Sequence, residues 1–296
     1  MCQRLAWLFI GNRRGRTFRG VFVDTETTGL TDTDKVIEIG VVSFDYDARG
    51  ITRIVDTFNE QEDPGVPLRQ EIVALTGLTN EYLEGKTFDR KRIQSALSEA
   101  RLLLAHNAFF DRRMLERVFP ITAEKPWACS QTQVPWADIG MGSTRLEYLA
   151  MRSGFFYDAH RAETDCRAAV HLLAQPYNPK DGSSRQTFTV LREAAIKAGL
   201  HVWLIDLPFD KKDEAKAAGC VWSDGNTPGI HKAWHREVTT PAEAQSVLEG
   251  ARTWYHRSAP PLLITLVTPT NRFSGRQGPR VPLEALIQMA SGESHA

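Results

Sequence analysis

The chain has 296 residues and a mass of 33.2 kDa, which is larger than a typical single domain and predicts two domains. Its residues are 42% hydrophobic and 24% charged, a composition that excludes disordered and collagen-like chains. The longest apolar runs are far shorter than the roughly 20 residues that a membrane-spanning helix needs, so we expect a soluble protein with no membrane partner. The four cysteines form no CxxC pair and are expected to be free thiols in a reducing cytoplasm.

The formal net charge is zero, but the charges are unevenly distributed. Residues 20–175 contain 24 acidic and 17 basic residues, whereas residues 1–19 contain five arginines and no acidic residue. We interpret residues 1–18 as a basic N-terminal extension. An acidic segment is a poor surface for an anionic polymer unless bound cations reverse its local charge.

The first predicted elements are three strands. Residues 20–26 are rich in β-branched and aromatic side chains and lead into a turn. Strands are also predicted over residues 36–46 and 51–58, and the four residues between them are too few for a helical crossover. We therefore expect these two strands to pair antiparallel.

Helices and short strands then alternate, which is typical of an α/β domain. The predicted strands cover residues 101–105 and 126–130. The predicted helices cover residues 69–75, 88–99, 109–118, 144–152 and 162–174. Together with the first three strands, they form a predicted domain over residues 19–175.

A turn-rich polar stretch, residues 176–187, is interpreted as a linker. Residues 188–257 are predicted to form a small α+β accessory domain, and residues 258–296 a flexible tail. The accessory domain contains four of the seven tryptophans. Large side chains at strand positions fill a small core well, so we favour a core role over the stacking of nucleic-acid bases.

Asp24 and Glu26 are the first candidate functional residues. Two residues apart on a strand, they point to the same side of the sheet. Two such anions repel each other by ~1 to 4 kcal/mol at about 4 Å, which a divalent cation would relieve. The alternative is a solvated turn that happens to carry two acidic residues.

Two further segments carry acidic residues near a helix start. Asp111 falls in the first turn of a predicted helix that Asn107 would cap. Asp165 occupies the same kind of position in a later helix, and His160 precedes it in the loop. The simpler interpretation is that both carboxylates interact with the helix dipole and that His160 is a surface residue.

At these three sites the chain resembles the DEDDh family of 3'-to-5' exonucleases. Its first motif, DxETTGL, corresponds to residues 24–30, and its second, HNAxFD, to residues 106–111. The third motif is a histidine five residues before an aspartate, here His160 and Asp165. The related DEDDy branch has a tyrosine four residues before that aspartate, where this chain has Arg161.

The resemblance covers residues 19–175 and includes the proofreading exonucleases of bacterial DNA polymerase III. It implies the α/β class: an RNase H-like mixed sheet with flanking helices. It also implies that four carboxylates hold two Mg²⁺ or Mn²⁺ ions, which prefer hard oxygen ligands, and that a histidine is the general base. The catalytic residues so implied are Asp24, Glu26, Asp111, His160 and Asp165, and the four acidic ones are the metal ligands.

The family also grips the terminal nucleotide with its first two motifs. The substrate contacts so implied are Thr27, Leu30, His106, Asn107 and Phe110. Leu30 and Phe110 could equally be ordinary core residues.

From this resemblance we expect a metal-dependent 3'-to-5' exonuclease of the proofreading or repair type. It would act on single-stranded DNA or frayed DNA 3' ends and release 5'-mononucleotides. One alternative is an exoribonuclease, because the same catalytic residues occur on family members that trim RNA. Another is a non-catalytic nucleic-acid-binding adaptor.

The second half of the chain has a separate resemblance. Residues 200–238 look like a small domain of unsettled role seen in bacterial and plasmid-borne proteins. A polymerase or another protein is the partner we expect for this part of the chain.

Overall fold

The computed structural model describes residues 16–31, 33–226, 230–256 and 260–292. The chain divides after Ala195 into two compact units. Most of the predicted N-terminal extension, residues 1–15, lies outside the described residues. No helix in the described ranges is long and apolar enough to cross a membrane.

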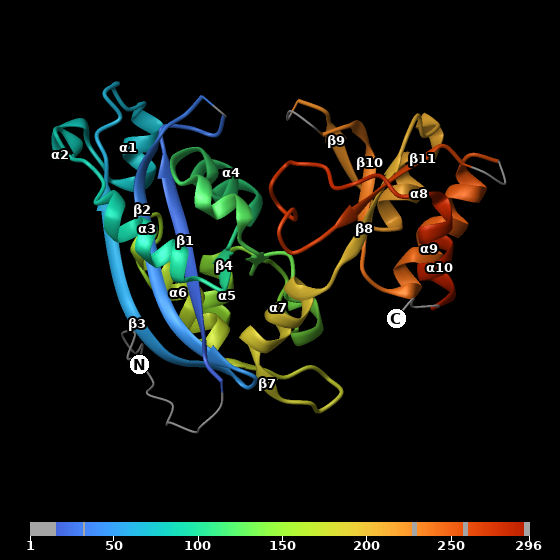
Figure 1. Ribbon diagram of the computed structural model, residues 1–296, viewed down its shortest axis with the longest axis horizontal. Coiled ribbons are helices and arrows are strands. Elements are labelled where there is room, and N and C mark those ends of the chain that lie inside the picture. The colour runs from blue at the N-terminus through green and yellow to red at the C-terminus, as the bar shows by residue number, and fades with distance from the viewer. Residues whose placement is uncertain (1–15, 32, 227–229, 257–259, 293–296) are drawn as a thin grey trace. The chain divides into compact units, whose positions relative to one another are not determined.

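A five-stranded mixed sheet forms the centre of the first unit (Figure 1). Its first three strands are an antiparallel meander, and the other two run parallel to the first of them. This arrangement confirms the predicted α/β class with an RNase H-like mixed sheet. In spatial order the strands are β3 (Gly50–Gln61), β2 (Val36–Asp47), β1 (Phe18–Thr27), β4 (Leu102–Ala105) and β5 (Trp127–Cys129).

Helices flank the sheet, as predicted. Because β1 and β4 are covered on both faces, they are continuous apolar runs, and Val21, Phe22 and Val23 are all fully buried. The short helix α2 was not predicted. The helices of this part are α1 (Gln70–Thr76), α2 (Asn80–Leu83), α3 (Arg90–Glu99), α4 (Ala108–Val118), α5 (Leu146–Arg152) and α6 (Ala162–Ala174), with short 3-10 turns at Pro120–Glu124 and Trp136–Ile139.

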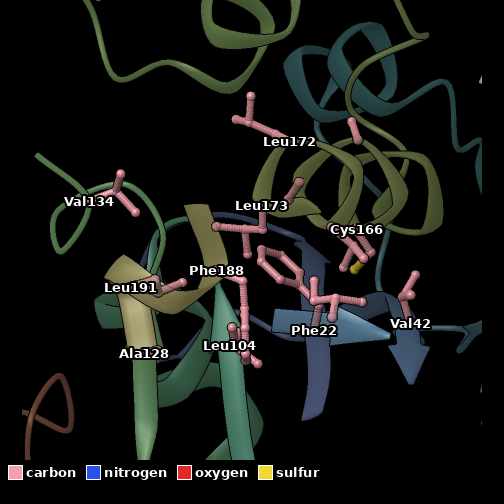
Figure 2. Close-up of a cluster of buried hydrophobic side chains, with 14 of the residues drawn as sticks. Phe22, Val42, Leu104, Ala128, Val134, Cys166, Leu172, Leu173, Phe188 and Leu191 are labelled. Carbon is pink, nitrogen blue, oxygen red and sulfur yellow. The ribbon is translucent and has the colours of Figure 1, made fainter. Parts of the chain in front are cut away.

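The main core lies between the sheet and helix α6, and it includes the next helix, α7 (Thr187–Ile196) (Figure 2). Phe188 and Leu191 of α7 are fully buried there beside sheet residues such as Phe22. The prediction that a separate domain begins at residue 188 was therefore wrong, because the apolar face of α7 packs in the first unit.

The predicted linker also contains structure. Its residues include the two short strands β6 (Pro176–Tyr177) and β7 (Arg185–Gln186), which pair with each other. The Gln175 carbonyl accepts hydrogen bonds from the Thr187 backbone and side chain. The segment is thus a short hairpin that returns the chain to the first core.

The second unit is built on a four-stranded antiparallel sheet. Leu262–Val267 forms the edge strand β11, and Leu286 of helix α10 packs in the core of this unit. The prediction of a flexible tail over 258–296 was therefore wrong for these segments. The elements are β11 (Leu262–Val267), β8 (Gly199–Leu204), β10 (Lys232–Val238) and β9 (Val221–Asp224), with a 3-10 turn at Phe209–Lys211 and helices α8 (Lys212–Ala217), α9 (Pro241–Trp254) and α10 (Leu283–Ser291).

Gly40 sets how closely helix α6 approaches the first sheet. It pairs with Asp24 across β2 and β1, and a Cβ atom there would lie 2.1 Å from the backbone carbon of Ala162. Its carbonyl accepts a hydrogen bond from Cys166 Sγ (3.3 Å). The absence of a side chain therefore lets the first turn of α6, which carries Asp165, lie directly against the strand pair.

We predict that Gly40→Ala destabilises the protein by ~1 to 3 kcal/mol, because the new methyl group must push the start of α6 away from β2. Urea denaturation measures the loss. Gly142→Ala is the matched control, since a Cβ there meets only the Tyr148 hydroxyl at 3.3 Å. Equal stability of the two variants would contradict this account.

Candidate active site

Three carboxylates meet at the end of strand β1. Asp24 and Glu26 lie on this strand, and Asp165 lies in the first turn of helix α6. One oxygen from each of the three lies within 4.8 Å of the others. The predicted same-side placement of Asp24 and Glu26 and the predicted approach of Asp165 thus occur together.

Asp111 reaches the same strand from helix α4. Its Oδ1 accepts hydrogen bonds from the Thr25 backbone N–H (3.0 Å) and the Thr25 hydroxyl (2.8 Å). It is 3% exposed and is not one of the three carboxylates that approach within 4.8 Å. Thr25 therefore holds Asp111 next to β1 through one carboxylate oxygen.

Burial and mutual repulsion raise the pKa values of these carboxylates. Burial, then the charge of Asp165, raises the pKa of Glu26 to about 8. Burial raises the pKa of Asp111 to about 7 and that of Asp165 to about 6. Burial, followed by the charges of Asp111 and Asp165, raises the pKa of Asp24 well above its ordinary value. A cation at this position would relieve the cost of keeping all four ionised.

Glu38 is a fifth carboxylate near the cluster, and it is paired with Arg161. It lies directly opposite Glu26 in the β1–β2 pair and is fully buried. It accepts hydrogen bonds from Arg161 Nη2 (2.8 Å) and the Ala162 backbone N–H (3.0 Å). Burial alone would raise the pKa of Glu38, but these bonds, with others from Asn59 and Gln61, hold it below its ordinary value. Glu38 therefore fixes the start of α6, and its charge adds to the causes that raise the pKa values of Asp24 and Glu26.

His160 lies in the loop that leads into α6. Its backbone has the left-handed conformation (φ 65°), and its N–H donates to Asp165 Oδ2 (2.9 Å). The imidazole is about half exposed, and its Nε2 lies 3.7 Å from Glu147 Oε1. The loop thus connects the histidine to the acidic cluster through its backbone, while the ring faces α5 and solvent.

Tyr157 lies in the same loop as His160. Its hydroxyl is buried and interacts with the Asp165 carboxylate at the start of helix α6. The nearby charge of Asp165, after burial, raises the pKa of Tyr157 above its ordinary value. The Tyr157 hydroxyl therefore belongs to the immediate surroundings of the acidic cluster.

Two predicted substrate residues lie at the end of β1 and just after it: Thr27 is its last residue, and Leu30 follows in the turn. Leu30 is 80% exposed, so the alternative that it belongs to the core is wrong. The Thr27 side chain is buried, and its hydroxyl donates to the Gly29 carbonyl. Leu30 therefore offers an apolar surface beside the acidic cluster, whereas Thr27 stabilises the turn that presents it.

The residues of the second motif also divide into one with a structural role and two that reach the surface. Both ring nitrogens of His106 have partners within the protein: Ser130 Oγ at 2.9 Å and the Thr144 carbonyl at 2.8 Å. The imidazole therefore stabilises the end of strand β4. We do not retain the predicted substrate contact through this ring. Asn107 occupies the N-cap position of α4, but its side chain makes no capping bond, contrary to our expectation. Asn107 is exposed and Phe110 is partly buried, so both present surface near Asp111.

Sequence reasoning missed the residues that hold the acidic cluster in place. Thr25 stands between two predicted ligands, and its role appears only from its bonds to Asp111. Arg161 was considered only as the residue that separates the two branches of the family, yet it pairs with Glu38. An acidic residue within an apolar strand run was the available signal for Glu38, because such a residue needs a buried partner.

Comparison with known proteins places this geometry in a family. The RNase T model, described as exonuclease, matches residues 21–173. DNA polymerase III subunit epsilon of Treponema pallidum (strain Nichols) is 29% identical over 160 residues, which cover 51% of this chain and 72% of that protein. DNA polymerase III PolC-type of Thermotoga petrophila is 32% identical over 161 residues, which cover 52% of this chain but 11% of that much longer protein.

Solved exonuclease structures are also similar. Exonuclease X in complex with 5' overhanging duplex DNA is 24% identical, with a TM-score of 0.41, over 52% of this chain and 89% of that chain. Exonuclease I (apo) is 18% identical, with a TM-score of 0.45, over 63% of this chain and 50% of that chain.

The matched residues contain every one of the clustered carboxylates, and they extend over more than half of the chain. The chain belongs to the RNase T family of exonucleases.

Proposed function

We propose that this protein is a metal-dependent 3'-to-5' exonuclease that hydrolyses DNA from its 3' ends to 5'-mononucleotides. The observation that carries the proposal is the meeting of Asp24, Glu26 and Asp165 within 4.8 Å, with Asp111 held against the same strand. The resemblance to proofreading exonucleases and the relationship to polymerase III subunit epsilon support the DNA substrate and a role in proofreading or repair.

The four carboxylates fit two Mg²⁺ or Mn²⁺ ions. They offer hard oxygen ligands, and the neighbouring Cys166 thiol is buried and bonded to the Gly40 carbonyl. Asp24, Glu26, Asp111 and Asp165 would hold these ions. When bound, the ions would supply charge stabilisation for the attacking and leaving oxygens of a phosphodiester displacement.

His160 is the proposed general base, which accepts the proton of the attacking water on an imidazole nitrogen. Its position at the start of α6 depends on its N–H bond to Asp165 and on the Glu38–Arg161 pair at the next residue. Glu147, 3.7 Å from the ring, would stabilise the imidazolium that forms. The loop thus holds the proton acceptor by its backbone and leaves the ring accessible.

The terminal nucleotide would be held by residues that flank the cluster. Leu30 and Phe110 offer apolar surface for the base, and the exposed Asn107 amide can hydrogen-bond to it. We retain these as the proposed substrate contacts, with Thr27 acting through the turn. The described cysteines are buried free thiols, which suits the cytoplasmic location that we propose.

The experiment that tests this function is the digestion of DNA and RNA strands labelled at either end, with Mg²⁺, Mn²⁺ or EDTA. Release of labelled mononucleotides from the 3' end of DNA, only with metal, is the expected result. Faster digestion of RNA would favour the exoribonuclease, and binding without any hydrolysis would favour the adaptor.

We predict that Asp24→Ala lowers turnover by about 10³-fold or more, because the ions held there supply several kcal/mol of transition-state stabilisation. Its melting temperature in EDTA should not fall, since repulsion among the remaining carboxylates is relieved. Asp158→Ala is the control, because Asp158 is an exposed acidic residue in the loop just before helix α6. Near-normal turnover of Asp24→Ala would refute the metal assignment.

We predict that, without divalent cations, the free energy of unfolding falls as the pH rises from 4.5 to about 8. Burial raises the pKa of Glu26 to about 8, so in this window the folded protein binds more protons than the unfolded chain. Stability is therefore lost as the folded carboxyl ionises. Urea denaturation across this range measures the slope, which Mn²⁺ and Glu26→Gln should each reduce.

We predict that His160→Ala lowers turnover by ~10²- to 10⁴-fold while the strand binds with nearly unchanged affinity. Added imidazole should restore part of the turnover, which a purely structural defect would not allow. Turnover of the variant close to the wild-type rate would assign the proton transfer to another group.

A further inference from the structure

A groove of about 540 Å³ lies in the second unit, and the described residues that line it all belong to this unit. It is bounded by the end of β8, the start of α8 and the paired strands β9 and β10. We call it the aromatic groove. Its principal residues are Asp206, Phe209, Lys212, Trp222, Lys232 and Trp234.

Large aromatic side chains are exposed in the aromatic groove. Phe209 is 80% exposed and Trp222 is 47% exposed. Trp222 pairs with Trp234 across β9 and β10, and their ring centroids are 5.8 Å apart. The tryptophans that do fill cores, Trp203 and Trp254, are 1% and 5% exposed. Neighbouring exposed aromatic rings of this size on one surface mark a binding site rather than a core.

Two lysines border these rings. Lys212 Nζ lies 4.2 Å from the centroid of the Phe209 ring, and Lys232 begins strand β10. Within the described residues, neither ammonium group has an ion pair, whereas the adjacent Lys211 pairs with Glu214. Asp206 is the one carboxylate in the groove lining. The groove therefore combines apolar ring faces with two cations that remain available for an anionic ligand.

We propose that the aromatic groove binds single-stranded nucleic acid, with a base stacked on Trp222 and Phe209 and a backbone phosphate near Lys212 or Lys232. Ring faces stack any base, and ammonium groups neutralise phosphates, so this combination suits an unpaired strand. The proposal rests on the proposed function, because the exonuclease substrate supplies the strand. The second unit is then a second grip on the polymer outside the acidic cluster.

The test measures binding of the full-length protein to strands of about 20 nucleotides in EDTA, which prevents hydrolysis. Trp222→Ala should bind oligo(dT) roughly 5- to 100-fold more weakly than the wild type, as expected for loss of base stacking. Val221→Ala is the matched control, because Val221 is the preceding residue of β9, is 60% exposed and does not line the groove. Oligo(U) of the same length shows whether DNA or RNA is preferred.

An abasic strand separates stacking from other contacts. It keeps three natural nucleotides at the 3' end and has abasic sugars elsewhere. The wild type should bind it more weakly than the natural strand, and Trp222→Ala should bind the two alike. Lys232→Gln should lower the slope of log affinity against log salt by ~0.7. If Trp222→Ala unfolds, Phe209→Ala replaces it, since an 80% exposed side chain contributes little to the core.

Hydrolysis of a dinucleotide with Mn²⁺ distinguishes this inference from the proposed function. A dinucleotide is too short to need a second grip, so Trp222→Ala and the wild type should cleave it equally. Failure of the wild type to cleave it would refute the proposed function, while the binding comparison would still decide the role of the groove. Equal affinity of the wild type and Trp222→Ala for natural strands would overturn the inference and leave the groove to a protein partner.

Discussion

Repulsion among the carboxylates at the end of β1 is the constraint on which the arrangement of the first unit depends. Asp24 and Glu26 are placed there by the alternation of the strand, while Asp111 and Asp165 are brought there by helices α4 and α6. Burial of apolar surface offsets the repulsion, because the strand residues beneath the site are among the most buried in the chain. The packing that holds these carboxylates together against their repulsion also places their oxygens where cations could bind.

Glu26 and Glu38 illustrate how environment decides the state of a carboxylate. They lie opposite each other on neighbouring strands. Arg161 and the Ala162 N–H hold the pKa of Glu38 below its ordinary value, whereas burial near Asp165 raises the pKa of Glu26 to about 8. Glu38 can therefore anchor the start of α6, and Glu26 remains uncompensated. A cation-binding site needs both kinds of carboxylate: one that anchors the surrounding structure and one that can bind the cation.

Some tryptophans of the second unit lie in its core, and others lie at its surface. Trp203 and Trp254 are buried, but Trp222 and Trp234 face a groove. Strand β9 contributes to this difference, because it is the edge strand of its sheet and its residues are mostly exposed. A tryptophan in such a strand finds less packing than one in the inner strand β8, so the same residue type is buried in one strand and exposed in the other.

Local patterns in the sequence predicted the α/β alternation and the same-side placement of Asp24 and Glu26. The RNase H-like fold and the full set of candidate ligands came from the resemblance of three motifs to a known family. The pleat of a strand is a short-range feature, so the spacing of Asp24 and Glu26 already indicated that they point to the same side. The meander of the first three strands followed in the same way from the short connection between β2 and β3.

Long-range packing decided the rest. Only the strand register places Glu38 opposite Glu26, and only the close approach at Gly40 brings α6 to β1. Helix α7 and strand β11 were assigned wrongly because their own sequences do not specify which sheet or core will cover their apolar faces. The aromatic groove likewise depends on which tryptophans the second sheet leaves exposed. Residue spacing and motifs thus determined which residues are the candidate metal ligands. Tertiary contacts determined which side chains hold them in place, because burial and pairing depend on residues far apart in the chain.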